Sequence, residues 1–230
     1  MTRAAFRVPA VLMAVVIGTA GAVSCNRSSP ATTGPDRPKA ASAHPEPSKT
    51  RTAPRAVDLP EHAVTSDKRP SFGAADTMAT GYTGKDFLTG LSKKWKLKLD
   101  EPVEQEMPDG KKRTYVNGRD GNGVTVSAGY ADHTLMSSLL CRTSTKKPAG
   151  FGFLAACTGL DVAGVDHSKA SSWLKQAKRE TDSLYAKKIA ETGNKKEYVV
   201  SGVFTSGPVT MILHRAYGTY SLRILGGAVA

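Results

Sequence analysis

The chain has 230 residues, and its 32 basic and 20 acidic side chains give it a formal net charge of +12 at pH 7. A two-lobed solute receptor needs a longer chain than this, so the length argues against that class of protein. The basic excess favours partners that carry negative charge.

Residues 1–24 have the three parts of a secretory signal peptide. Two arginines, Arg3 and Arg7, precede a run from Val8 to Val23 that contains no charged side chain. This run is shorter than the about 20 apolar residues that a membrane-spanning helix needs. A basic start, a short apolar middle and a small-residue end therefore predict export.

The leader ends in Ala22-Val23-Ser24-Cys25. These residues resemble the lipobox of bacterial lipoproteins, in which a cysteine becomes acylated and N-terminal; that family prefers Leu at the position of Ala22. The resemblance, of the high-GC Gram-positive type, implies palmitate-like chains on Cys25 and a place on the extracytoplasmic face of the cell membrane. Each buried methylene adds about 0.8 kcal/mol of membrane affinity. The alternative is an ordinary signal peptide whose removal releases a soluble protein.

Residues 25–75 form an expected tether. Eight of the 13 prolines of the chain fall between residues 26 and 75, and Phe72 is the only aromatic residue there. Such a segment cannot bury enough apolar surface to offset the entropy of ordering. We therefore expect a disordered linker between the acylated cysteine and a folded domain.

Residues 76–230 are expected to form a single α+β domain. The first half predicts a helix near 87–95 and strands at 113–117, 124–130 and 134–142. The second half predicts a long helix that ends at Gly193, then strands at 197–204, 209–216 and 219–225. We expect a tandem αβββ repeat, with one antiparallel sheet and two helices on one of its faces. This element order is similar to that of the β-lactamase inhibitor proteins, and the resemblance carries no site residues with it.

Cys141 and Cys157 are the two cysteines of this domain. An oxidising compartment favours a disulfide between them, and two free buried thiols are the alternative. A metal site has little support because the two residues lack the usual ligand spacing.

Candidate catalytic groups are sparse. His133 and His167 each follow an aspartate, and His214 lies on an expected strand, so a hydrolase that uses these histidines with a nearby Asp is the alternative function. Aspartate and histidine are also ordinary turn and cap residues. The chain has no HExxH, Gly-x-Ser-x-Gly or phosphate-binding glycine motif, so we predict no catalytic residues, metal or cofactor.

The basic residues of the domain occur in short clusters, which would meet anionic lipid headgroups or wall polymers outside the cell. A solvated basic surface that serves solubility is the alternative. The sequence thus predicts a non-catalytic binding domain for a protein or an anionic envelope polymer, and not for nucleic acid. The expected binding residues are Lys93, Lys94, Lys96, Lys98, Lys111, Lys112 and Arg113.

Overall fold

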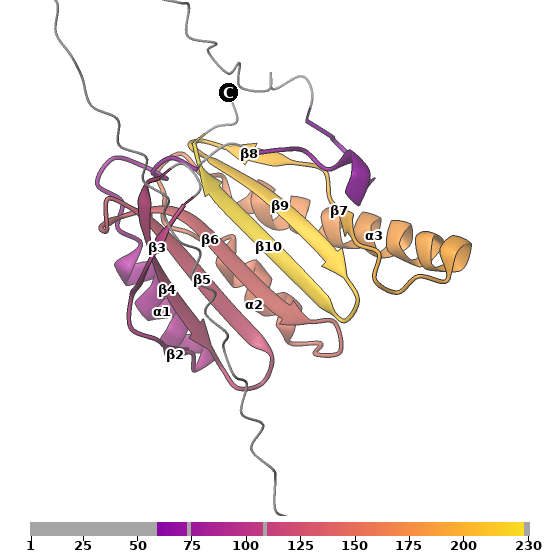
Figure 1. The fold of residues 1–230 in the computed structure, drawn as a ribbon, viewed down its shortest axis with the longest axis horizontal. Helices are drawn as coiled ribbons and strands as arrows, with labels where there is room; N and C mark the ends of the chain where they lie inside the picture. Colours follow the sequence, from indigo (N-terminus) through magenta and orange to yellow (C-terminus); the bar gives the residue numbers. More distant parts are fainter. Residues whose placement is uncertain (1–58, 73–74, 108–109, 228–230) are drawn as a thin grey trace, which may run out of the picture. The chain divides into compact units, whose positions relative to one another are not determined.

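The computed structural model describes residues 59–72, 75–107 and 110–227. The expected signal peptide, the expected lipid site at Cys25 and most of the expected tether lie outside these ranges. The described residues form an α+β fold with one antiparallel sheet, which is the class that the sequence predicts (Figure 1).

The described part of the chain contains three α-helices, a short 3-10 helix and ten strands. The helices are α1 (Lys85–Trp95), α2 (Gly150–Cys157) and α3 (His167–Thr192), and the 3-10 helix is η2 (Ser66–Lys68). The strands are β1 (Val64–Thr65), β2 (Lys98–Leu99), β3 (Val103–Glu106), β4 (Lys112–Arg119), β5 (Val124–Ala131), β6 (Leu135–Ser144), β7 (Val199–Val200), β8 (Phe204–Ser206), β9 (Val209–Ala216) and β10 (Thr219–Gly226).

The sheet has the order β1-β7-β9-β10-β6-β5-β4-β2, with β3 paired to β4 and β8 paired to β9. Strands from the two halves of the chain meet at its centre, where β10 pairs with β6. In Figure 1 the three α-helices lie behind the sheet. None of the α-helices in the described ranges covers the opposite face, and we call it the helix-free face.

The core lies between the sheet and the helices, and strand alternation decides which residues enter it. Leu139 and Cys141 of β6 stand opposite Ile224 and Leu222 of β10, and all four side chains are fully buried. The helices contribute residues such as Leu174 of α3 to the same cluster. Truncation of one of these leucines to alanine costs about 2–5 kcal/mol.

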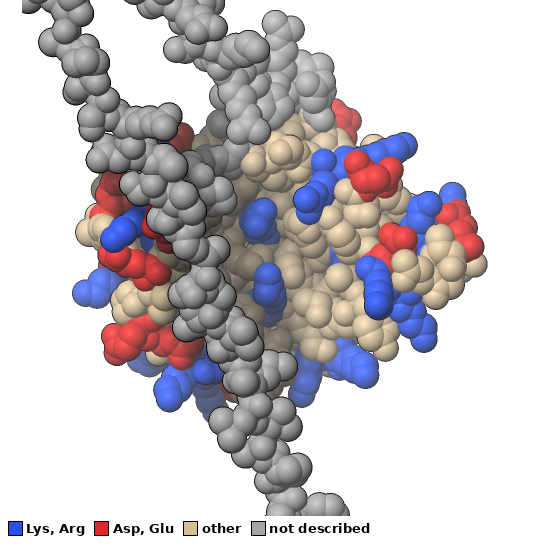
Figure 2. Space-filling model, viewed as in Figure 1, with Lys and Arg blue, Asp and Glu red and all other residues tan. Residues whose placement is uncertain are grey.

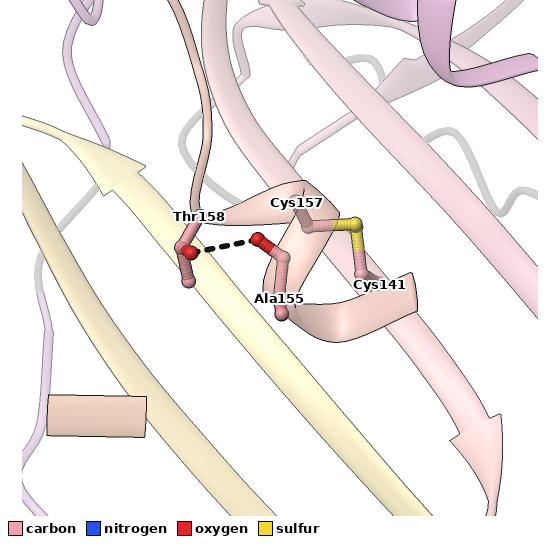
Figure 3. The surroundings of a disulfide bond; sticks show 4 residues. All are labelled: Cys141, Ala155, Cys157 and Thr158. Atoms are coloured by element: carbon pink, nitrogen blue, oxygen red, sulfur yellow. Dashed lines mark hydrogen bonds between the residues drawn. A yellow bond between two sulfur atoms is a disulfide. The ribbon is translucent and has the colours of Figure 1, made fainter. Parts of the chain in front are cut away.

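Cys141 and Cys157 form a disulfide, as the sequence predicts. The two residues are 16 positions apart with a Cα–Cα distance of 6.7 Å, and the bond joins β6 to the end of α2 (Figure 3). Thr158 follows immediately, and its hydroxyl donates a hydrogen bond of 2.8 Å to the carbonyl of Ala155. The disulfide therefore fixes α2 against the centre of the sheet.

Helix α2 was not expected, so the count of two helices is corrected to three. Its sequence contains Gly150 and Gly152, and glycine in a helix costs about 1 kcal/mol relative to alanine. Phe153 and Leu154 are fully buried, and the disulfide fixes the last residue of the helix. Burial and the covalent bond outweigh the poor helix propensity.

Part of the segment that was expected to be tether belongs to the folded domain. Strand β1 pairs with β7, the amide of Val203 donates to the carbonyl of Pro60, and the amide of Ala63 donates to Glu180 of α3. Gly202 permits this close packing, because an added Cβ there would meet the backbone of Glu61. The folded domain thus includes residues from 59 onward rather than from 76.

Candidate anion-binding face

The strand registers place a row of polar side chains straight across the helix-free face. Arg119 of β4 stands opposite Thr125 of β5, which stands opposite Arg142 of β6. Ser221 of β10 continues the row to His214 of β9. At the other end Lys98 of β2 pairs with Arg119. We call this set the basic row: Lys98, Arg119, Thr125, Arg142, Ser221 and His214. Because neighbouring strands are about 4.8 Å apart, the row is about 24 Å long.

Arg223 lies beside this row on the same face. It follows Ser221 by two residues on β10, which makes it a diagonal neighbour of both Arg142 and His214. Such neighbours have Cα atoms about 7–8 Å apart. Arg113 also belongs to this face, but it lies six residues from Arg119 along β4, or about 20 Å away.

Three of these arginines, Arg113, Arg142 and Arg223, have no acidic partner among the described residues. Arg119 lies 3.9 Å from Asp100, with both side chains well exposed, which makes a weak pair. Arg142 and Arg223 are both exposed, and neither forms an ion pair with any residue that the structure describes. Their guanidinium groups are therefore available to an anion from solution.

The helix-free face is hollowed at two adjoining places. A groove of about 820 Å³ is lined by residues that include Arg113, Tyr115, His214 and Arg223. A smaller hollow of about 270 Å³ includes Arg119 and Arg142, and the two share Ser127 and Leu140 in their walls. Figure 2 views this face: basic side chains stand in a visible centre that is otherwise uncharged, and the acidic ones in view lie toward the margins.

His214 is a neutral imidazole within this basic surface. Burial lowers the pKa of His214 to about 4, and the charges of Arg223, Arg69 and Arg142 push it the same way. Its ring stacks on Tyr198 with centroids 6.3 Å apart, and the Tyr198 hydroxyl accepts a 2.9 Å hydrogen bond from Arg69. The row thus ends in a group that adds no charge at neutral pH.

The structure does not gather the seven expected binding residues into one patch. Lys98 and Arg113 belong to the helix-free face, whereas Lys93 and Lys94 lie in the last turn of α1 and Lys96 is its C-cap. Lys111 directly precedes β4, and Lys112 begins that strand. Lys112 lies 3.7 Å from Glu104. It is seven residues along β4 from Arg119, the residue that pairs with Lys98, and this is a distance of about 23 Å.

Sequence reasoning missed Arg142 and Arg223, because each is a single charge within a largely apolar strand. The available signal was their alternation. In Cys141-Arg142-Thr143 and Leu222-Arg223-Ile224 the basic residue stands between buried neighbours. A period of two then requires each arginine to point away from the core.

The three candidate histidines lie apart. His133 is in the turn between β5 and β6, 2.7 Å from the Thr114 hydroxyl and 3.3 Å from Glu104. His167 begins α3 and lies 3.3 Å from the carbonyl of Thr158. Within the described ranges no carboxylate is shared by two of these histidines, and His214 has no carboxylate partner. The geometry gives the hydrolase alternative no assembled site.

A second charged cluster lies on the helix side of the sheet. Asp182 of α3 accepts hydrogen bonds from Lys178 at 2.6 Å, Arg215 at 3.0 Å and the Tyr220 hydroxyl. Burial alone would raise the pKa of Asp182, but these three bonds outweigh burial and leave the pKa lowered. Because each cation has a partner, this cluster joins α3 to β9 and β10 and offers no open binding position.

No family model, curated protein or solved structure matches the chain. Within the described ranges, no cluster of three or more potential metal-ligating side chains occurs. In the same ranges, none of the helices has the length and apolar character required to span a bilayer.

Proposed function

We propose that this protein is a lipid-anchored lipoprotein of the cell envelope whose folded domain is a non-catalytic binding domain for an anionic macromolecule. Acyl chains on Cys25 would hold it at the extracytoplasmic face of the cell membrane. The residues before the domain would then act as a flexible tether. The partner is an anionic polymer or an acidic protein of the envelope, and the export signal argues against nucleic acid.

The observation that carries this proposal is the pair of unpaired arginines, Arg142 and Arg223, on the hollowed helix-free face. An isolated guanidinium on a surface contributes little to stability, and two neighbouring like charges repel each other. An incoming anion removes this repulsion and forms charge-assisted hydrogen bonds. The arrangement therefore suits binding better than it suits folding.

A charge-matched comparison tests the proposal. In the full-length protein, Arg142→Gln combined with Arg223→Gln should weaken binding to an anionic cell-wall polymer preparation by about tenfold or more. The control combines Lys175→Gln with Arg179→Gln on the exposed side of α3, which removes the same charge elsewhere. Equal losses in the two double variants would mean that binding follows net charge and not this face.

We also propose that the two halves of the domain are a diverged αβββ repeat, with the helices related by it covering one face of the sheet. In support, α1 precedes β4-β5-β6 and α3 precedes β8-β9-β10. The two sets of strands adjoin through the β6–β10 pair, at the centre of the sheet. The repeat would explain why the helix-free face is continuous across both halves.

A further inference from the structure

We propose that the ligand of the helix-free face is a linear phosphodiester polymer that crosses the strands over Arg119 and Arg142 of the basic row and over Arg223 beside it. This inference rests on the proposed function and adds the chemistry and the direction of the ligand. Three features of the face support it: the spacing of its cations, the kind of hydrogen-bonding groups between them, and the hollows that contain them.

The three arginines lie along a line across the strands and do not surround a single pocket. Arg119 and Arg142 stand two strands apart, which is about 10 Å, and Arg142 and Arg223 are diagonal neighbours about 7–8 Å apart. One small anion cannot contact all three. A chain with one negative group for each repeating unit can, because each guanidinium fork binds two oxygens of one phosphate.

The groups between the arginines are neutral and rich in hydrogen-bond donors. Thr125 and Ser221 provide hydroxyls on either side of Arg142, and Asn117 provides an amide near Arg119. No Asp or Glu stands at the helix-free positions of β4, β5, β6, β9 or β10, all of which lie in the described ranges. Asp100, outside these strands, lines the smaller hollow beside Arg119. An acidic peptide would bring backbone amide donors as well as acceptors, and the guanidinium groups of this face cannot accept from them. A phosphodiester chain brings charged acceptors, which match this face.

The two hollows fit a single polymer strand better than they fit the surface of a membrane. Arg119 and Arg142 line the smaller hollow and Arg223 lines the groove that adjoins it. A single polymer strand can enter both hollows in succession, whereas a layer of lipid headgroups is broad and meets the rim first. The ligand is therefore a soluble or wall-attached polymer and not a lipid.

The direction in which the bound polymer crosses the sheet can be tested with Arg113. A polymer that followed β4 would pass Arg119 and Arg113, whereas one that crosses the strands passes Arg119, Arg142 and Arg223. Arg113 lines the same groove as Arg223. It stands four residues along β4, or about 13 Å, from Asn117, the β4 residue that the strand pairs place in line with Arg223. Its substitution separates the two directions.

The experiment uses the full-length protein and synthetic glycerol-phosphate oligomers of increasing length, with binding measured by calorimetry. Affinity should rise with length until an oligomer reaches all three arginines, a span of roughly 17 Å, and then level off. Arg142→Gln and Arg223→Gln should each weaken binding of the longest oligomer by about tenfold, and Arg113→Gln by less than about twofold. Thermal melts of every variant show whether the fold is retained, which the exposed positions 142 and 223 and the half-buried position 113 should permit.

Poly-L-glutamate of matched charge and phosphatidylglycerol vesicles are the comparison ligands. Weaker binding of both than of the longest oligomer supports the inference. Equal or tighter binding of poly-L-glutamate, or of the vesicles, overturns the phosphodiester assignment while the proposed function stands. A larger loss for Arg113→Gln than for Arg142→Gln overturns the crossing direction. Failure of every polyanion to bind removes the proposed function together with this inference.

Discussion

The surroundings of His214 make the stability of the fold depend on pH. His214 lies on β9 between Tyr198 and three arginines, and burial with those charges lowers its pKa to about 4. An unfolded chain holds its histidines near a pKa of about 6.5. Between these two values the unfolded state binds more protons than the folded state, so the stability of the fold rises with pH across that window.

His214 should therefore make the domain less stable as the pH falls from about 6.5 to about 4, by up to about 3 kcal/mol. His214→Gln, which cannot take up a proton, should remove this part of the pH dependence. Urea denaturation at neutral pH and near the lower end of the window measures the effect as a difference between the two proteins. Parallel changes in unfolding free energy would show that His214 protonates as readily in the folded state as in the unfolded one.

At the residue scale, the sequence shows which basic residues are adjacent in the chain but not which ones are neighbours in the fold. Clusters such as Lys93-Lys94 and Lys111-Lys112-Arg113 are conspicuous because the charges are adjacent, yet the fold disperses them. Arg142 and Arg223 become neighbours only when β6 pairs with β10, across 81 positions of sequence. A long-range register is needed to bring them together, and no local pattern contains it.

At the scale of elements, helix α2 depends most on a single bond. It has eight residues, of which the first, Gly150, and the third, Gly152, are glycines. In the sequence it lies between β6 and the long helix α3. The disulfide attaches its last residue to the centre of the sheet. Closure of a loop of this size contributes about 3 kcal/mol in the chain-entropy description.

Cys141→Ala combined with Cys157→Ala should lower the free energy of unfolding by about 3 kcal/mol, with α2 the element most affected. Denaturation curves give the loss, and hydrogen exchange at Phe153 and Leu154 shows whether it is local. Reduction of the native protein serves as the comparison, because it breaks the same bond without changing the residues. A double variant as stable as the oxidised protein would contradict this account of α2.

The elements that the sequence predicts are those with a strong local signal. Asp166 caps α3 by accepting a 2.9 Å hydrogen bond from the amide of Lys169, and Gly193 ends that helix at a φ of 64°. The alternating strands β9 and β10 were likewise expected nearly as they are found. Short strands such as β1 and β3 were not, because a few residues of pairing leave no periodicity to detect.

At the scale of the whole molecule, the two faces of the sheet differ in the side chains that they carry. One is covered by the three α-helices and contains the core. The other keeps a row of basic and hydroxyl side chains in register across six strands, with hollows beside it. The fold thus separates the residues that stabilise it from those that we assign to binding.

The central claim is that this basic face is displayed outside the cell on a lipid anchor, since only there would it meet envelope polymers. The most direct test expresses the full chain in a Gram-positive host and measures the intact mass and membrane association of the product, with Cys25→Ala as control. The account predicts a membrane-bound protein that begins at Cys25 and carries added acyl mass, both lost in Cys25→Ala. A soluble product with another N-terminus, unchanged by the substitution, would contradict it.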